Sequence, residues 1–101
     1  MVVTKREVKW TQRAVQDKLR IMEFWYLRNQ SVSYSLKLER LFNKSLDLLS
    51  THPEMGIIFS QKPPIQFKTV RGYRLYYIFD EKTITLIAIW DTRRNPDKLK
   101  F

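Results

Sequence analysis

The stretch "IQFKTVRGYRLYYIFDEKTITLIAIW", residues 65–90, contains three short runs that are rich in β-branched and aromatic residues. The runs are "IQFKTV" (65–70), "YRLYYIF" (73–79) and "TITLIAIW" (83–90), joined by "RG" and "DEK". Such residues favour strands, and connections this short join antiparallel neighbours. The stretch therefore predicts a three-stranded antiparallel meander. Its last run is apolar at most positions, which predicts a strand in the interior of the sheet.

The residues before this stretch have helical periodicity instead. From Gln12 to Asn29 apolar side chains recur at helical spacing, and Thr11 lies where an N-cap residue belongs. The recurring set is Val15, Leu19, Met22 and Tyr26, flanked by Ala14, Ile21 and Trp25. A second periodic run begins at Tyr34 and ends at His52-Pro53, because proline disfavours helical geometry in the residue before it. Since the connection between them is short, we expect an antiparallel helical hairpin.

Residues 2–10 alternate weakly between apolar and polar side chains, which suits a half-exposed strand. The predicted fold class is therefore α+β: an N-terminal strand, an antiparallel helical hairpin and then the three-stranded meander. We expect the helices to pack on one face of the sheet. A length of 101 residues with 44% hydrophobic content supports one core, so the prediction is a single domain over residues 1–101.

Composition narrows the classes of function. The chain has no cysteine and one histidine, which excludes disulfides and thiolate chemistry and disfavours a transition-metal site, so we expect no metal and no cofactor. It has no apolar run of the roughly 18 residues that a membrane span needs, and we expect a cytoplasmic protein. The formal charge of +9 favours a polyanionic partner, either nucleic acid or an acidic protein. The same charge is also compatible with solubility alone.

An acid and two arginines follow the last predicted strand at once, as Asp91, Arg93 and Arg94. One interpretation is that the sheet is a rigid mount for cations that bind phosphate, with Asp91 holding one guanidinium in place. The other is a solvated strand exit in which Asp91 pairs with the nearer arginine. The residues alone leave both interpretations open.

Four motifs occur together in a characteristic order along the chain. They are Trp10-Thr11 followed by Ala14 and Asp17, Pro53 and Gly56 after the second helix, the strand "GYRLYY" (72–77), and Arg93-Arg94. In this order, and over essentially the whole chain, the sequence resembles the RelE/ParE superfamily of bacterial toxins. The resemblance implies the toxin of a type II toxin-antitoxin module, with an antitoxin partner that we expect to be acidic and partly disordered.

Members of that superfamily share a fold and differ in action. RelE-type toxins cut messenger RNA on the ribosome without a metal ion, and ParE-type toxins inhibit DNA gyrase. Our first interpretation is a RelE-type endoribonuclease that arrests translation. The alternatives are a gyrase inhibitor without nuclease activity and an inactive basic protein that binds an antitoxin or nucleic acid.

The resemblance also implies candidate site residues for RNA cleavage. Arg74 matches the strand arginine of the family, Arg93 matches the arginine after the last strand, and Lys68 matches one of two lysines, with Gln66 in place of the other. These three are the candidate catalytic residues, with Lys68 as a base whose pKa the neighbouring cations would lower. The candidate RNA or phosphate-binding residues are Arg71, Tyr76, Arg94 and Lys98, and Asp91 is the expected partner of Arg93. Strand alternation places Tyr76 on the face of Arg74 and Tyr73 on the opposite face.

The gyrase alternative has its own support in the sequence. The two predicted helices are long, and the opening "WTQRAVQDKLRIMEFW" (10–25) is more similar to ParE-type members. The chain ends in "DKLKF", which lacks the tyrosine or histidine that ribosome-dependent enzymes carry there. Phe101 can stack on a base, but it cannot transfer a proton. Under this alternative Arg93 and Arg94 contact gyrase or its bound DNA.

Overall fold

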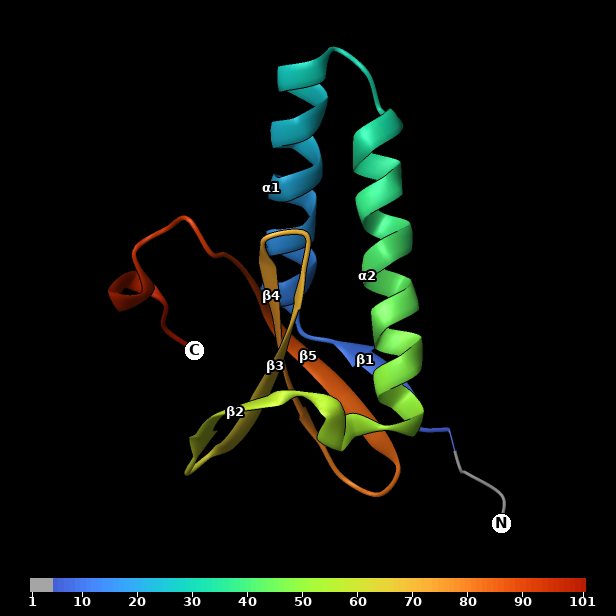
Figure 1. The fold of residues 1–101 in the computed structure, drawn as a ribbon, viewed down its shortest axis with the longest axis vertical. Helices are drawn as coiled ribbons and strands as arrows, with labels where there is room; N and C mark the ends of the chain where they lie inside the picture. The colour runs from blue at the N-terminus through green and yellow to red at the C-terminus, as the bar shows by residue number, and fades with distance from the viewer. Residues whose placement is uncertain (1–4) are drawn as a thin grey trace.

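A computed structural model describes residues 5–101, and Figure 1 shows the order of its elements. The strands are β1 (Glu7–Trp10), β2 (Ile57–Gln61), β3 (Pro64–Val70), β4 (Tyr73–Phe79) and β5 (Thr83–Asp91). The helices are α1 (Gln12–Asn29) and α2 (Ser33–Thr51), with short 3₁₀ helices η1 (Pro53–Met55) and η2 (Pro96–Lys98). The predicted α+β class is confirmed: a strand, a helical hairpin and an antiparallel meander. Residues 2–4 of the expected first strand lie outside the described residues.

The five strands form one sheet in the order β1-β5-β4-β3-β2. β1 runs parallel to β5, from Glu7 opposite Thr83 to Trp10 opposite Leu86, and the other pairs are antiparallel. β5 thus lies in the interior of the sheet, as predicted. β2 is an additional strand that periodicity did not indicate, because four of its five side chains are exposed and it has no alternation of buried and exposed positions.

The helical hairpin is fixed by local signals and by contacts between the helices. Thr11 caps α1 by accepting a hydrogen bond from the Ala14 amide at 3.1 Å. Lys18 pairs with Glu39 at 2.8 Å, and the Ser35 hydroxyl donates to the Met22 carbonyl at 2.6 Å. Met22 comes after Lys18 on α1, whereas its partner Ser35 comes before Glu39 on α2. The two helices are therefore antiparallel. In Figure 1 the far end of the hairpin extends beyond the loop between β3 and β4.

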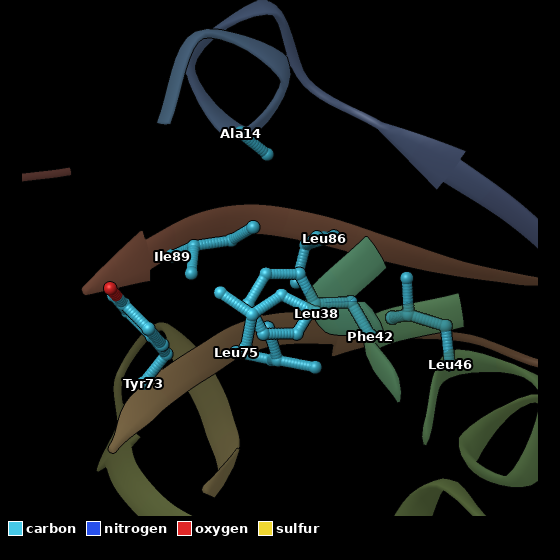
Figure 2. Close-up of a cluster of buried hydrophobic side chains, with 8 residues drawn as sticks. All are labelled: Ala14, Leu38, Phe42, Leu46, Tyr73, Leu75, Leu86 and Ile89. Atoms are coloured by element: carbon cyan, nitrogen blue, oxygen red, sulfur yellow. The ribbon is translucent and has the colours of Figure 1, made fainter. Parts of the chain in front are cut away.

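The helices cover one face of the sheet, and the main core lies between the two layers. Figure 2 shows its buried residues, which come from both helices, β4 and β5. They are Ala14, Leu38, Phe42, Leu46, Tyr73, Leu75, Leu86 and Ile89. α1 contributes its smallest apolar side chain, Ala14, which lets the helix backbone approach the sheet closely. Ile21 and Trp25 pack against the same core.

The opposite face of the sheet has a second, largely aromatic cluster. Its buried members are Ile65, Phe67, Tyr76, Ala88 and Trp90. Leu99, in the segment after η2, packs against this cluster, and the Phe101 ring lies 5.2 Å from that of Tyr76. The end of the chain therefore folds back across the face that the helices leave open. Among residues 5–101, neither helix is long and apolar enough to cross a membrane.

Candidate functional site

Asp91 binds the Arg93 guanidinium at the end of β5. Arg93 donates from Nε to Asp91 Oδ1 at 3.0 Å and from Nη2 to Oδ2 at 2.8 Å, a two-pronged geometry that fits a carboxylate. The Arg93 amide also donates to Oδ1, at 2.9 Å. The side-chain hydrogen bond from Arg93 is the main cause that lowers the pKa of Asp91, and the same contact raises the pKa of Arg93. The strand exit thus holds one arginine in a fixed place.

Tyr73 lies opposite Asp91 and faces the helices. Its hydroxyl accepts a hydrogen bond from Trp25 Nε1 at 2.8 Å, which ties α1 to the start of β4. Burial is the main cause that raises the pKa of Tyr73, so the phenol stays neutral. A cleft of about 180 Å³ lies beside it, lined by Arg20, Ile21, Phe24, Tyr73, Asp91 and Arg94. The cations of this cleft are Arg20 and Arg94, and Arg20 is also 3.7 Å from Asp17 Oδ1.

Arg74 lies on the other face of the sheet, among aromatic rings. Its guanidinium carbon is 4.2 Å from the centre of the Phe67 ring, and Nη1 donates to the Tyr76 hydroxyl at 3.3 Å. This confirms that Tyr76 shares the face of Arg74. Trp90 is the cross-strand neighbour of Arg74, and the Arg94 guanidinium stacks over the Trp90 ring at 4.5 Å. Sequence reasoning missed Phe67 and Trp90, although strand alternation across β3 and β5 would have placed them here.

Lys68 lies on the opposite face of the sheet from Arg74. It is paired with Leu75 of the main core, whereas Arg74 is paired with Thr69, so Lys68 and Arg74 point to opposite faces. The expectation that Lys68 lies beside Arg74 is therefore wrong, because register and alternation together turn Lys68 toward α2. There it lines a cleft of about 370 Å³ whose other residues are Lys5, Lys44, Ser45, Asp47, Leu48 and Thr51.

The remaining candidates are at exposed positions. Arg71 occupies the turn between β3 and β4 with a φ of 52°, and Lys98 lies in η2. Gln66 donates to the Gly56 carbonyl at 3.1 Å, so it has a structural contact where the family's second lysine would be. Among residues 5–101 no group of three histidine, aspartate or glutamate side chains could hold a metal ion. The described arrangement can bind anions at fixed arginines, and Lys68 is on the other face of the sheet from Arg74.

The strand, hairpin and meander form the fold that the resemblance to the RelE/ParE superfamily of toxins implies. Within that superfamily the sequence model described as the ParE toxin of the type II toxin-antitoxin system parDE matches residues 8–96. The chain belongs to this family of ParE toxins. As the toxin of such a system it has an antitoxin as its partner.

Solved structures agree with this assignment at the level of the fold. The chain is similar to a structure described as the chromosomal ParDE TA system from P. aeruginosa, with a TM-score of 0.68. The two are 17% identical, and the match covers 86% of this chain and 96% of the other. A search of curated proteins finds no match to the sequence.

Proposed function

We propose that this chain is a toxin that inhibits DNA gyrase and does not cut RNA. The observation that carries the proposal is the separation of Lys68 from Arg74, which point to opposite faces of the sheet. Cleavage of RNA at a 2′-hydroxyl needs a base within hydrogen-bond reach of that hydroxyl and cations around the phosphorus. Lys68 faces α2 while Arg74 faces the aromatic cluster, so one phosphodiester cannot contact both without a change of strand register.

The arginines then act as contact residues. Arg93 is fixed by Asp91, and Arg94 is stacked on Trp90, so both present guanidinium groups with little freedom left to lose on binding. Guanidinium groups suit carboxylates and phosphates equally, and both occur on gyrase with its bound DNA. Membership in the ParE family supports this assignment over the ribonuclease.

The antitoxin of this toxin is proposed to be acidic and partly disordered. The formal charge of +9 attracts a polyanionic chain, and a disordered segment can cover a large surface when it folds on binding. A small reading frame beside the gene whose product is basic, or which does not bind the toxin, would contradict this proposal.

The test of the toxic activity combines an assay on the purified protein with an assay in cells that express it. We expect supercoiling of relaxed plasmid by purified gyrase to be inhibited, while messenger RNA from cells in which the toxin is briefly induced keeps intact 5′ ends. The variant Arg74→Ala serves as the control, because it removes the arginine that the ribonuclease would need. Codon-phased cuts in the messages that vanish in Arg74→Ala would overturn the proposal in favour of the ribonuclease.

A further inference from the structure

Three lysines line the cleft between α2 and β3. The cleft has a volume of about 370 Å³, and ligand sites in proteins have volumes of roughly 300–1,000 Å³. Lys44 comes from the second half of α2, Lys68 from β3 and Lys5 from the segment before β1. Asp47 is the acidic residue among those that line it. We call this site the lysine cleft.

The lysine cleft has an excess of positive charge. Asp47 forms an ion pair with Lys5. Neither Lys44 nor Lys68 has an acidic side chain within 4.0 Å among residues 5–101. Three ammonium groups therefore share one carboxylate, and the cleft attracts an anion.

Lys68 is the member of the cleft that solubility does not explain. Its side chain is half-buried, whereas Lys5 and Lys44 are exposed. It pairs across the strands with Leu75 of the main core, so an apolar residue at this position would extend that core. A charged side chain that leaves water without a partner costs free energy. An anion bound in the cleft would supply the missing opposite charge.

The kind of cation indicates the kind of anion. The lining residues include three lysines and no arginine. A guanidinium group matches the two coplanar oxygens of a carboxylate, whereas ammonium groups act as separate point charges that can surround the oxygens of a phosphate. We propose that the lysine cleft is a binding site for phosphate groups, which come either from a free polyphosphate or from the backbone of a nucleic acid.

This site is distinct from the arginines of the proposed function. The lysine cleft shares no residue with the cleft that contains Arg20 and Arg94. Arg74 lies on the other face of the sheet from Lys68, so a phosphate bound in the lysine cleft does not contact it. The inference therefore goes beyond gyrase inhibition and predicts binding without cleavage.

The test measures the binding of two phosphate probes to the purified protein by isothermal titration calorimetry. The probes are inorganic triphosphate and a DNA duplex of about 12 base pairs, and citrate is the control anion, because it carries carboxylates in place of phosphates. Lys68→Gln removes the half-buried cation, with Lys82→Gln in the turn between β4 and β5 as its control. Lys44→Ala is matched by Lys37→Ala. Lys37 is exposed on the same helix seven residues earlier and does not line the cleft.

We expect the wild type and both control variants to bind a phosphate probe with similar affinity, and Lys68→Gln and Lys44→Ala to bind it roughly tenfold more weakly. A loss of affinity for the duplex assigns a nucleic-acid backbone as the source of the phosphate. A loss confined to triphosphate assigns a free polyphosphate. Circular dichroism melting checks that each variant is folded, and Lys44→Ala, an exposed surface change, keeps the test decisive if Lys68→Gln unfolds.

Three results would overturn the inference. Equal losses in the control variants would mean that net charge alone governs binding. Citrate bound as tightly as triphosphate would mean that the cleft does not select phosphate. Unchanged affinity in folded Lys68→Gln and Lys44→Ala would mean that the anion binds elsewhere. Because the titration contains no gyrase, each of these results leaves the proposed function standing.

Discussion

Two of the sequence motifs meet at a single tyrosine. The Tyr77 hydroxyl donates to the Pro53 carbonyl at 2.5 Å, and burial raises the pKa of Tyr77 to about 12, which keeps the donor protonated. The same hydroxyl lies under Gly56, where a Cβ atom would overlap it. Pro53 and Gly56 after α2 and the final tyrosine of "GYRLYY" therefore form one packing unit. This explains why these distant motifs occur together.

The first prediction follows from this contact. Gly56→Ala should lower the free energy of unfolding by about 1–3 kcal/mol, because the new methyl group must displace a buried ring. Urea unfolding measures the loss. Glu54→Ala, in the same turn but exposed, is the control and should stay close to the wild type. A Gly56→Ala variant as stable as this control would show that the Tyr77 ring moves aside freely.

The second prediction concerns the dependence of stability on pH through Asp91. Its folded-state pKa is lowered, chiefly by the hydrogen bond from Arg93. A lowered folded pKa gives a contribution to stability that is present above the unfolded value of about 3.9 and is lost as the pH falls through the folded pKa.

The wild type should therefore be more stable than Asp91→Asn at pH 7, and the difference should shrink as the pH falls below the unfolded pKa of about 3.9. Unfolding in urea at both pH values measures the two differences. Asp97→Asn in η2 is the comparison variant and should show a smaller change between the two conditions. A constant difference for Asp91→Asn would mean that the ion pair contributes nothing.

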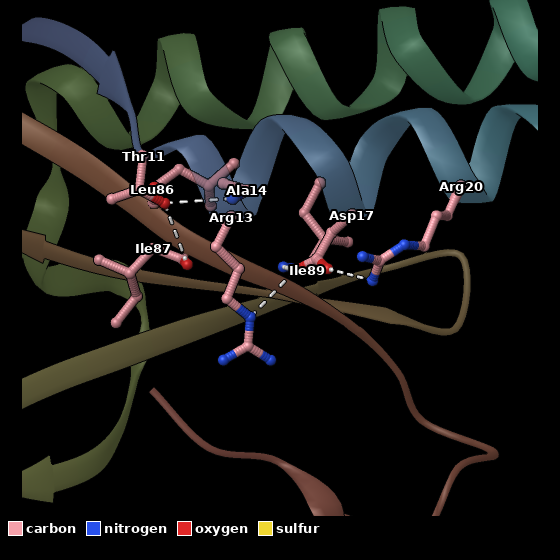
Figure 3. A network of polar contacts seen from close by, with 8 residues as sticks. All are labelled: Thr11, Arg13, Ala14, Asp17, Arg20, Leu86, Ile87 and Ile89. Atoms are coloured by element: carbon pink, nitrogen blue, oxygen red, sulfur yellow. Dashed lines mark hydrogen bonds and ion pairs between the residues drawn. The ribbon is translucent and has the colours of Figure 1, made fainter.

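At the scale of elements, the start of α1 completes the edge of β5 where β1 ends. β1 pairs with β5 only as far as Leu86. Beyond it, the Thr11 amide and hydroxyl donate to the Leu86 carbonyl, the hydroxyl also reaches the Ile87 carbonyl at 3.2 Å, and the Ile89 amide donates to Asp17 Oδ2 at 3.0 Å. Figure 3 shows this network, with Arg13 and Arg20 on either side of Asp17. The Thr11 and Asp17 side chains at the start of α1 thus satisfy backbone groups of β5 that β1 leaves unpaired.

The third prediction tests this cap. Asp17→Ala leaves the part-buried Ile89 amide without its partner and should cost about 1–3 kcal/mol of stability. Hydrogen exchange of the Ile89 amide should accelerate more than that of amides paired between β4 and β5. Glu23→Ala, at an exposed position of the same helix, is the control. Unchanged exchange at Ile89 would mean that water or Thr11 replaces the carboxylate.

The sequence allowed the helices, the N-cap and the meander to be predicted, because periodicity and capping are local properties. The side of α1 that packs against the sheet was not predictable from the sequence. The larger apolar side chains Val15, Leu19 and Tyr26 are exposed, whereas the small side chain of Ala14 is buried. The position of Lys68 depends on its register against Leu75, which is fixed only when β3 and β4 pair. The expectation that Lys68 lies beside Arg74 failed for this reason, whereas the local pair of Asp91 and Arg93 was predictable.

At the scale of the whole molecule, the end of β5 and the helical hairpin meet at one cleft. Arg94 shares this cleft with Arg20, Ile21 and Phe24 of α1. The molecule is elongated, with principal extents of 46 × 32 × 21 Å, and the far end of the hairpin extends beyond the loop between β3 and β4 (Figure 1). A partner that binds at the strand exit can therefore also contact α1.

The fourth prediction is that the two arginines after β5 are needed for gyrase inhibition. Arg93→Ala combined with Arg94→Ala should weaken gyrase inhibition by roughly tenfold or more, because two fixed guanidinium contacts are lost. Lys62→Ala combined with Lys82→Ala is the control, because it removes the same charge from two turns and should preserve the inhibition. If the control weakens gyrase inhibition equally, net charge and not the strand exit governs the interaction.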